Sequence, residues 1–480
     1  MIVAHSYKGQ TIAIFGLGRT GLSAAKSLTQ GGARVWAWDD NETSRKAALE
    51  AGVSVTDLTD ANWNEIDGLL LSPGIPHDKP TAHWSAQKAK EAGVRIICDI
   101  EIFAQEIAAR APDQRPKIIA ITGTNGKSTT TTLIGHILET AGKDAQVGGN
   151  IGRGILDLNP IHRGGYYVLE LSSYQLERTY SLKADVAVLL NLSPDHLDRH
   201  GDMTGYETAK RRIFRNQTDA DTIVVGVDDV HGKRICTELL AQNGRSIIPV
   251  SGLRSLGRGV CAIKSKLYCV MGRNVEEIAD FTLARTLEGT HNWQNAAAAY
   301  AATKSVGVSN KDIGGALLSF PGLAHRMEEI GTVAGVRYIN DSKGTNIDAT
   351  RQALKAYDNI YWIAGGVAKD GGLEGLAADM GHIKRAYLIG DAAEDFSQTL
   401  SGEKVSHKLC GTLKQAVICA TKDALQSRKS NPVILLSPAC ASFDQFKNFE
   451  VRGEAFRSQV EDIINMFEDA KRRKKEGHAA

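Results

Sequence analysis

The sequence has few cysteines, and none of them forms a Cys-x-x-Cys pair. Seven cysteines are scattered over 480 residues. An odd number of unpaired cysteines is typical of reduced thiols and argues against a disulfide framework or a zinc site. The sequence also lacks a leader with a basic stretch and an apolar core, and it lacks an apolar run long enough to span a bilayer. We therefore expect a cytoplasmic protein with no membrane partner.

A strong net charge is also missing. The 57 lysines and arginines nearly balance the 55 acidic residues, and the net charge is +2. This balance gives no support for nucleic-acid binding. The one basic run, residues 471–477, ends a helix-like segment, where cations are favourable and solvated. We expect small-molecule partners and a monomer.

Glycine, in contrast, is abundant, with 48 residues. Apolar runs alternate with helix-length intervals, which predicts α/β architecture with largely parallel sheets. A chain of this length suggests about three domains. We predict a Rossmann-like domain at 1–98, a central P-loop ATPase-type α/β domain with extra β strands at 99–322, and a second Rossmann-like domain at 323–480. Short strands are expected within 221–290, including DFTLA at 280–284, and four strands are expected in the last block.

The first glycine motif is Gly16-Leu-Gly-Arg-Thr-Gly21, which follows a strand-like run. It matches the dinucleotide fingerprint, and Asp39 and Asp40 follow where an acidic residue would meet a ribose hydroxyl. The simplest alternative is a tight turn without a ligand. The pattern does not separate a nicotinamide cofactor from another diphosphate nucleotide, because both place a pyrophosphate over the helix N-terminus.

The second glycine motif is Gly123-Thr-Asn-Gly-Lys-Ser-Thr129, between a strand-like run and a helical run. It is shorter than the standard phosphate loop, since Ile121 stands where the first glycine is usually found. Main-chain amides of such a loop cradle phosphates, Lys127 reaches the β- and γ-phosphates, and Ser128 offers a hydroxyl to Mg²⁺. The motif predicts ATP binding.

Polar residues at later strand ends extend this site. Glu170 ends an apolar strand and His196 follows the next one, so both belong to the sheet edge at which α/β folds bind ligands. Each is also compatible with an ordinary surface or loop residue. Lys210 lies in a run of three basic residues, which usually form a solvated helix face. If it is buried and neutral, it can instead take up CO₂ as a carbamate and bind metal.

Three polar loops of the last block follow strands in the same way and predict a substrate pocket. They carry Asp341 and Lys343, then Lys369, and then Ser437, Ser442 and Phe449.

In their order along the chain, these motifs resemble those of the Mur ligases. They are GLGRTG, LSPGI, GTNGKSTTT, GGNIG, VLELSSYQLE, PDHLDRHG, AKRRI, HNWQNAAAA, HRME, NDSKGTN and SPACASFDQFKNFEVRG. The last motif points to the D-glutamate-adding branch. The resemblance implies an ATP-dependent ligase of peptidoglycan synthesis, which joins D-glutamate to UDP-N-acetylmuramoyl-L-alanine through an acyl phosphate. It also implies two Mg²⁺ ions, with Mn²⁺ as an alternative, and a carbamylated Lys210.

The resemblance further implies a role for each matching residue. Catalysis is expected from Lys127, Glu170, His196 and Lys210, and metal binding from Ser128, Glu170, His196 and Lys210. ATP is expected at Gly123, Thr124, Asn125, Gly126, Lys127, Ser128, Thr129, Asn292, Arg326, Asp341 and Lys343. The UDP substrate is expected at Gly18, Arg19, Thr20, Asp39, Asp40, Gly74 and Asn150, and D-glutamate at Lys343, Thr345, Lys369, Ser442 and Phe449.

One loop departs from the family pattern, because Val367 stands where other members carry an acidic residue two positions before the lysine. Three alternatives stay open at this point. Another ligase of the Mur or folylpolyglutamate type shares the phosphate loop, but the latter has no need of the first domain. An NAD-dependent dehydrogenase would use the GLGRTG turn. A P-loop switch would not need the polar loops of the last block.

Overall fold

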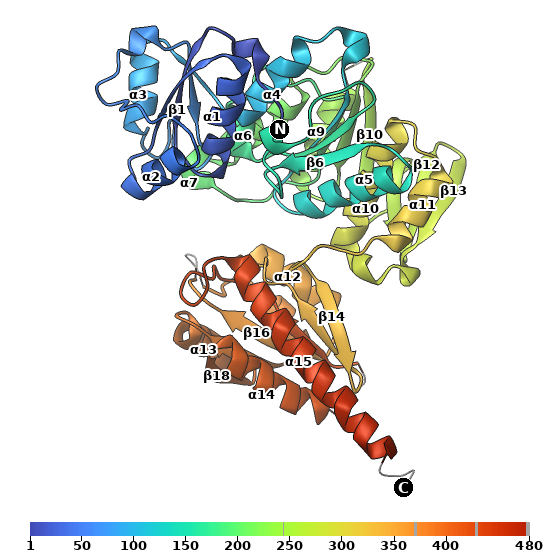
Figure 1. Cartoon of the computed structure of the whole chain (residues 1–480). Helices are drawn as coiled ribbons and strands as arrows, with labels where there is room; N and C mark the ends of the chain where they lie inside the picture. Colours follow the sequence, from blue (N-terminus) through green and yellow to red (C-terminus); the bar gives the residue numbers. More distant parts are fainter. Residues whose placement is uncertain (243, 369–371, 428–430, 477–480) are drawn as a thin grey trace. The chain divides into compact units, whose positions relative to one another are not determined.

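The fold contains three α/β sheets (Figure 1). The structure is a computed structural model that describes residues 1–242, 244–368, 372–427 and 431–476. Two compact units can be separated: unit 1 comprises residues 1–284 and 290–320, and unit 2 comprises residues 285–289 and 321–480. In the described part of the chain, no helix has the length and apolarity required to cross a membrane.

The first sheet of unit 1 is four-stranded and parallel, in the order β2-β1-β3-β4. Its central strand is β1, whose side chains are all buried, so a continuous apolar run forms it as expected for a covered parallel strand. The strands are β1 (Thr11–Phe15), β2 (Arg34–Trp38), β3 (Gly68–Leu71) and β4 (Arg95–Ile97), and the helices are α1 (Arg19–Gly31), α2 (Glu42–Glu50), α3 (Trp84–Glu91) and α4 (Asp99–Ala108).

The second sheet of unit 1 has nine strands in the order β13-β12-β11-β10-β9-β8-β5-β7-β6. The pairs from β6 to β11 are parallel, and β12 and β13 add antiparallel strands at one edge. Its strands are β5 (Lys117–Thr122), β6 (Ala145–Gly149), β7 (Tyr166–Glu170), β8 (Val186–Leu189), β9 (Thr222–Gly226), β10 (Ser246–Ser251), β11 (Arg258–Ile263), β12 (Lys266–Met271) and β13 (Asn274–Asp280). Its helices are α5 (Lys127–Thr140), α6 (Ser173–Glu177), α7 (Leu197–His200), α8 (Met203–Arg211), α9 (Val230–Leu240), α10 (Thr290–Ser305) and α11 (Asn310–Ser319).

The order of this sheet places the phosphate loop at a switch point. Strand β5 lies between β7 and β8, so the chain leaves β5 toward one side of the sheet and later returns to its other side. Open α/β sheets bind ligands outside the carboxyl ends of strands at such a point. The loops that follow β5, β7 and β8 therefore share one edge.

Both sheets of unit 1 contribute to one hydrophobic core, which includes Ile14 and Leu70 of the first sheet and Leu169 and Leu189 of the second. This shared core explains why residues from both sheets form a single compact unit. The α10 helix is buried along most of its length, because its alanines present little volume and let it pack closely on α5.

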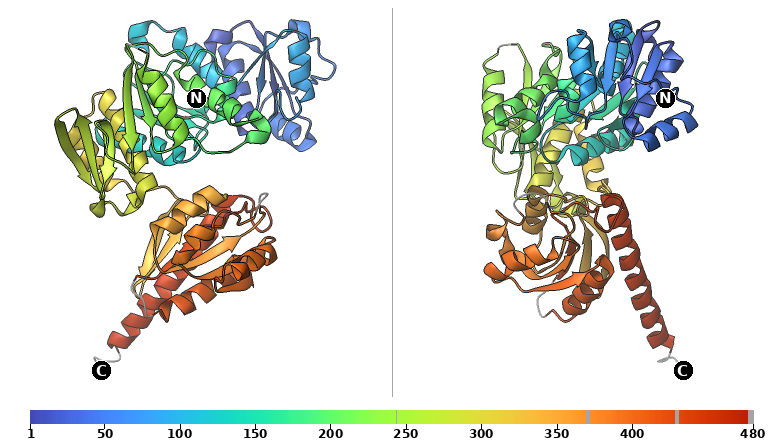
Figure 2. Two further views of the ribbon diagram at one scale, coloured as in Figure 1. Left: turned by 180° about the vertical axis from the view of Figure 1, so that it is seen from behind. Right: turned by 90° about the vertical axis from the view of Figure 1, so that its left-hand side faces the viewer.

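Unit 2 holds a six-stranded sheet in the order β14-β15-β19-β16-β17-β18, parallel except for β14. Helices α12 and α13 cover one face, and α14 and the long α15 cover the other (Figure 2). The strands are β14 (Glu328–Val333), β15 (Val336–Asn340), β16 (Ile360–Gly365), β17 (Ile383–Ile389), β18 (His407–Gly411) and β19 (Val433–Leu436), and the helices are α12 (Ile347–Ala356), α13 (Ala393–Gly402), α14 (Leu413–Leu425) and α15 (Phe449–Glu476).

The predicted fold class is confirmed, while two local predictions are wrong or incomplete. DFTLA is not a strand, because residues 281–283 form a 3-10 turn after the edge strand β13. The four strands predicted for the last block exist, but β14 and β18 were missed, since both are only partly buried and carry polar residues. The domain boundaries at 98 and 322 stay predictions.

Candidate functional site

The phosphate loop closes tightly between β5 and α5. Gly123 and Gly126 have φ values of +155° and +82°, which favour glycine. A Cβ on Gly126 would lie 2.2 Å from the side-chain oxygen of Asn295 on α10. The buried Asn292 lies beside it, because the Asn295 Nδ2 donates to the Asn292 Oδ1 over 3.3 Å. The close approach of α10 therefore requires the second glycine of the motif.

Asn191, directly beyond β8, holds the outer side of this loop. Its Oδ1 accepts from the Asn125 amide at 2.8 Å, and its Nδ2 donates to the Asn125 carbonyl at 3.1 Å. Its own carbonyl accepts from the Thr124 amide at 3.0 Å. Asn191 was missed from the sequence. The available signal was an amide side chain just after a buried strand beside the loop.

Lys127 begins α5 and bends back over its own loop. Its Nζ donates to the carbonyls of Gly123 at 3.0 Å and Thr124 at 2.7 Å. Ser128 and Thr129 follow it and are buried. The first turn of α5 carries no acidic residue, so the amides at this helix end and the lysine place positive charge beside the loop. This combination suits a phosphate group.

Lys210 on α8 is buried directly behind the loop. It is 1% exposed, and its Nζ donates to the Gly123 carbonyl at 2.8 Å and to the Thr122 hydroxyl at 3.4 Å. The Nζ also lies 4.7 Å from the centre of the Tyr206 ring. Burial, followed by the nearby charge of Lys127, holds the pKa of Lys210 well below its ordinary value. The side chain is therefore a candidate for a neutral amine, which is the form that reacts with CO₂.

Glu170 ends β7, the neighbour of β5. It is 2% exposed, and its Oε1 accepts from the Asn150 Nδ2 at 2.8 Å. Its Oε2 has no hydrogen-bond partner among the described residues. Burying a carboxylate oxygen without a partner is costly, so this oxygen is suited to bind a cation. The adjacent strand β5 continues into the phosphate loop, which carries the hydroxyl of Ser128. Glu170 and Ser128 therefore suit Mg²⁺.

His196 follows β8 and has a φ of +53°, immediately before α7. Its ring lies 4.9 Å from the ring of Tyr174, and its Nε2 lies 3.4 Å from the carboxylate of Asp195. The described residues contain no group of three or more His, Cys, Asp or Glu side chains arranged for a metal ion. A metal at His196 and Lys210 therefore stays a prediction that depends on the carbamate.

Asp39, just after β2, connects to the first glycine turn by a hydrogen bond. Its Oδ2 accepts from the Leu17 amide at 2.7 Å and its Oδ1 from the Asn41 amide at 2.9 Å. Asp40 is instead contacted by His83 and by the Trp84 indole nitrogen, each at 3.2 Å. Of the other predicted UDP residues, Gly18 is the N-cap of α1, Arg19 and Thr20 begin this helix, and Gly74 follows β3. Asn150 lies beside Glu170.

In unit 2, the loops after β15, β19 and β16 are neighbours, because these strands lie side by side and parallel. Asp341 is buried, and its Oδ2 accepts from the Ser437 hydroxyl at 2.7 Å. Burial raises the pKa of Asp341 to about 7, although the Ser437 hydrogen bond opposes the change. The Lys343 ammonium lies 5.4 Å from the ring centre of Phe449.

Arg452 of α15 joins two of these loops and was missed from the sequence. It is 1% exposed and donates to the Ser342 hydroxyl at 3.0 Å, the Ser342 carbonyl at 2.9 Å and the Cys440 carbonyl at 3.1 Å. The Ser342 hydroxyl in turn donates to the Phe449 carbonyl at 2.8 Å. The predicted Arg326, Thr345 and Ser442 belong to the described residues of unit 2, while Lys369 lies outside the described residues.

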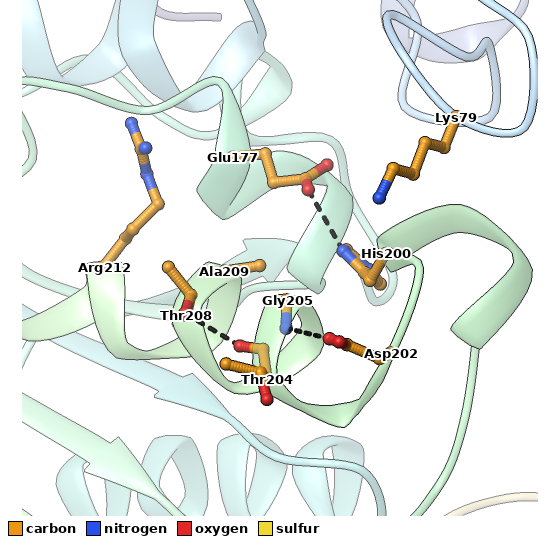
Figure 3. A pocket seen from close by; sticks show the side chains of 9 residues that line it. All are labelled: Lys79, Glu177, His200, Asp202, Thr204, Gly205, Thr208, Ala209 and Arg212. Atoms are coloured by element: carbon orange, nitrogen blue, oxygen red, sulfur yellow. Dashed lines mark hydrogen bonds and ion pairs between the residues drawn. The ribbon is translucent and has the colours of Figure 1, made fainter.

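A pocket of about 400 Å³ lies on another side of α8 (Figure 3). The Glu177 carboxylate points to the buried His200, and its Oε1 lies 3.0 Å from the His200 Nδ1. The pocket contains no residue predicted for the site. It is lined by Lys79, Glu177, His200, Asp202, Thr204, Gly205, Thr208, Ala209 and Arg212.

Three family models match successive parts of the chain. Residues 10–98 match the "Mur ligase MurD-like, N-terminal domain", residues 121–303 the "Mur ligase middle domain", and residues 325–440 the "Mur ligase, glutamate ligase domain".

Two relatives extend this similarity over almost the full length. The UDP-N-acetylmuramoylalanine–D-glutamate ligase of Caulobacter vibrioides is 55% identical over 96% of this chain and 97% of its own. The protein of the same name from Phenylobacterium zucineum is 52% identical over 98% and 100%. Among solved structures, the UDP-N-acetylmuramate-alanine ligase MurC of Thermotoga maritima aligns over 94% of this chain and 99% of its own, with a TM-score of 0.58 and 19% identity. That likeness supports the fold alone.

Proposed function

The chain belongs to the Mur ligase family, and we propose that it joins D-glutamate to UDP-N-acetylmuramoyl-L-alanine in an ATP-dependent step of peptidoglycan synthesis. The observation that carries this proposal is the 55% identity to the Caulobacter vibrioides ligase over 96% of the chain. The geometry around the phosphate loop gives the proposal its chemistry. Membership in this family argues against the dehydrogenase and switch alternatives.

ATP activates the alanyl carboxylate in this reaction. A carboxylate does not acylate an amine at neutral pH, because its oxygen is a poor leaving group. A carboxylate oxygen of the substrate attacks the γ-phosphorus of ATP, the bond from that phosphorus to the ADP oxygen breaks, and an acyl phosphate forms. Lys127 and the α5 amides are placed to stabilise charge on the transferred group.

The second step forms the amide. The D-glutamate nitrogen attacks the acyl carbon and loses a proton, and the tetrahedral intermediate expels inorganic phosphate. For D-glutamate we assign Lys343, Thr345, Lys369, Ser442 and Phe449, and for additional ATP contacts Asn292, Arg326, Asp341 and Lys343. The approach of Lys343 to Phe449 and the burial of Asp341 support a prepared site in the loops of unit 2.

The family uses Mg²⁺, and the donor set of this chain suits it. We assign one ion to Ser128 and Glu170 because the Glu170 Oε2 is buried without a hydrogen-bond partner among the described residues. A second ion is assigned to His196 and a carbamylated Lys210, whose burial favours the neutral amine. When bound, the metal neutralises phosphate charge, and Mn²⁺ offers the same chemistry.

The UDP part of the substrate is assigned to the GLGRTG turn with Gly18, Arg19 and Thr20, and to Asp39, Asp40, Gly74 and Asn150. The amides at the start of α1 suit a diphosphate. We further propose that the protein acts as a cytoplasmic monomer, which size-exclusion chromatography with light scattering tests for the oligomeric state.

Phosphate release from ATP tests the proposed function. The assay contains UDP-N-acetylmuramoyl-L-alanine and compares D-glutamate with L-glutamate, L-lysine and diaminopimelate. We expect D-glutamate to stimulate release at least about tenfold more than the others, since a polar pocket built for one acceptor leaves its groups unpaired with another. Equal stimulation by the four amino acids, or none by D-glutamate, would show that the acceptor is wrongly assigned.

A further inference from the structure

We propose that Arg178 is a positioning residue of the ligase reaction, which fixes the loop after β3 and so sets the position of the UDP-linked substrate relative to the phosphate loop. The inference rests on the proposed function for its substrate. Its physical basis is a set of contacts within unit 1, between the segment that follows β7 and the loop at 72–76.

Arg178 directs its guanidinium at main-chain carbonyls of the first sheet. It caps the C-terminus of α6 and is 1% exposed. Its Nη1 donates to the carbonyls of Leu71 at 2.8 Å and Ser72 at 3.0 Å, and its Nη2 donates to the carbonyl of Ile75 at 2.5 Å. One side chain therefore fixes both ends of the Ser72–Ile75 turn.

This turn in its own right supports the first glycine motif. The Ser72 hydroxyl donates to the Gly16 carbonyl at 2.9 Å. A Cβ on Gly16 would lie 2.6 Å from the Ser72 hydroxyl oxygen and 2.8 Å from the Ile75 Cδ1, so the turn and the motif are in close contact. A shift of Ser72 and Ile75 is therefore transmitted to the residues assigned to the UDP diphosphate.

Arg199 connects the same turn to the second side of the phosphate site. Its Nη2 donates to the Ile75 carbonyl at 2.9 Å, and its guanidinium lies 4.9 Å from the Tyr174 ring centre. The Tyr174 ring lies 4.9 Å from the ring of His196. The Ile75 carbonyl thus accepts hydrogen bonds from two arginines. Arg178 belongs to the segment after β7, the strand that Glu170 ends, and Arg199 belongs to the segment after β8.

A purely stabilising role does not explain this arrangement well. The side chain of Arg178 donates to uncharged carbonyls, its Nε has no hydrogen-bond partner among the described residues, and Arg199 adds a second positive charge. Burying a cation without a hydrogen-bonded carboxylate is costly, and burial lowers the pKa of Arg178 to about 10 although the Glu177 charge opposes the change. The buried guanidinium of Arg178 provides precise placement of the turn, because a fixed planar guanidinium can hold several carbonyls at once. Precise placement matters, since an error of about 1 Å between reacting groups costs about 100-fold in rate.

The test compares Arg178→Met with Arg115→Met in two measurements. Arg115 is the matched control, since it also donates to main-chain carbonyls. Its two acceptors, Arg110 and Ala108, belong to a single segment before β5. Hydrogen exchange of the ligand-free proteins reports on residues 72–76 and 16–18. Steady-state phosphate release reports KM for UDP-N-acetylmuramoyl-L-alanine and for ATP.

For Arg178→Met we expect faster exchange in both segments and a KM for the UDP substrate raised about tenfold or more, with the KM for ATP changed less than about twofold. Arg178→Lys should recover part of the loss, and Arg115→Met should match the wild type in both measurements. If Arg178→Met does not fold, Arg199→Met replaces it, with a smaller rise of about threefold, since it removes one hydrogen bond to Ile75.

Unchanged exchange in residues 72–76, or an equal rise in both KM values, would overturn the positioning role. The exchange experiment requires no substrate. A wild-type protein that shows no D-glutamate-dependent phosphate release would therefore overturn the proposed function without affecting the measurement on the turn.

Discussion

The Nζ of Lys210 lies 2.8 Å from the Gly123 carbonyl, so a buried lysine on α8 contacts the first residue of the phosphate loop. The same carbonyl also accepts from Lys127 at 3.0 Å. Two lysines thus converge on one carbonyl, although only one of them is buried almost completely. Their mutual repulsion adds to burial in lowering the pKa of Lys210.

We expect Lys210→Ala to lose at least about 100-fold in turnover, because the loss of a metal-binding carbamate removes a large part of the charge stabilisation of phosphoryl transfer. Short-chain carboxylic acids such as acetate should restore part of the activity by filling the vacated space with a carboxylate. The measurement is phosphate release with and without acetate. Normal turnover of the alanine variant would disprove the carbamate.

The same lysine predicts a pH dependence of stability. Its pKa is lowered in the folded state, so the unfolded state binds more protons between that lowered pKa and the ordinary value of 10.5. The free energy of unfolding should therefore rise with pH in this window, and Lys210→Met should lack this contribution. Urea unfolding at pH 7 and pH 9 in CO₂-free buffer measures the difference. A methionine variant with the wild-type pH dependence would contradict the assignment of a buried, neutral amine.

Asp341 predicts a dependence of the opposite sign. Its pKa is raised from 3.8 to about 7, so the folded state binds more protons than the unfolded state between these values. The free energy of unfolding should fall as pH rises through this window, by roughly 4 kcal/mol over the full range at about 1.4 kcal/mol per pKa unit. Asp341→Asn should remove this decrease of the free energy of unfolding with pH. Ser437→Ala should extend this window to higher pH and leave its lower limit unchanged, since the Ser437 hydrogen bond lowers the pKa in the folded state alone. Urea unfolding from pH 4 to pH 8 measures both.

Gly126→Ala should weaken ATP binding at least about tenfold, because a left-handed backbone and a Cβ 2.2 Å from the Asn295 side chain both oppose the native loop. Gly142→Ala is the matched control. Gly142 has a similar φ of +71°, but its Cβ would meet nothing within 4 Å. The Gly142→Ala variant should have the same backbone strain, about 1 kcal/mol, and an unchanged affinity for ATP. Isothermal titration with ATP and Mg²⁺ separates the two, and equal affinities would contradict the role of the contact with Asn295.

Glu170→Gln should raise the Mg²⁺ concentration for half-maximal activity about tenfold or more, because it removes the charge of the unpartnered Oε2 while an oxygen remains for Asn150. Its free energy of unfolding should not fall, since a buried carboxylate is removed. Mg²⁺ titration of phosphate release and Mn²⁺ binding by electron paramagnetic resonance measure the first effect. Glu139→Gln, on the exposed end of α5, serves as control. An unchanged Mg²⁺ requirement in Glu170→Gln would rule out this ligand.

Periodicity and glycine placement predicted the architecture because buried parallel strands are continuous apolar runs. Strand β5, for example, is apolar from Ile118 to Ile121 and stays buried up to the loop that follows it. The same signal failed for β13, whose exposed glutamates lie on an edge strand. It also failed for Arg452 and Asn191, whose partners are main-chain groups of segments distant in the sequence.

The sequence by itself determined that this chain folds into α/β sheets and that a shortened GTNGKST loop follows a buried strand. Local chemistry sufficed, since glycine, lysine and serine spacing depends on neighbouring residues alone. Only the tertiary structure decided that Lys210 is buried against this loop, that the Glu170 Oε2 has no hydrogen-bond partner among the described residues, and that Arg178 holds the turn at Ile75. Burial and pKa depend on which distant segments pack together, and in a solvent-exposed run of basic residues Lys210 would be an ordinary ammonium.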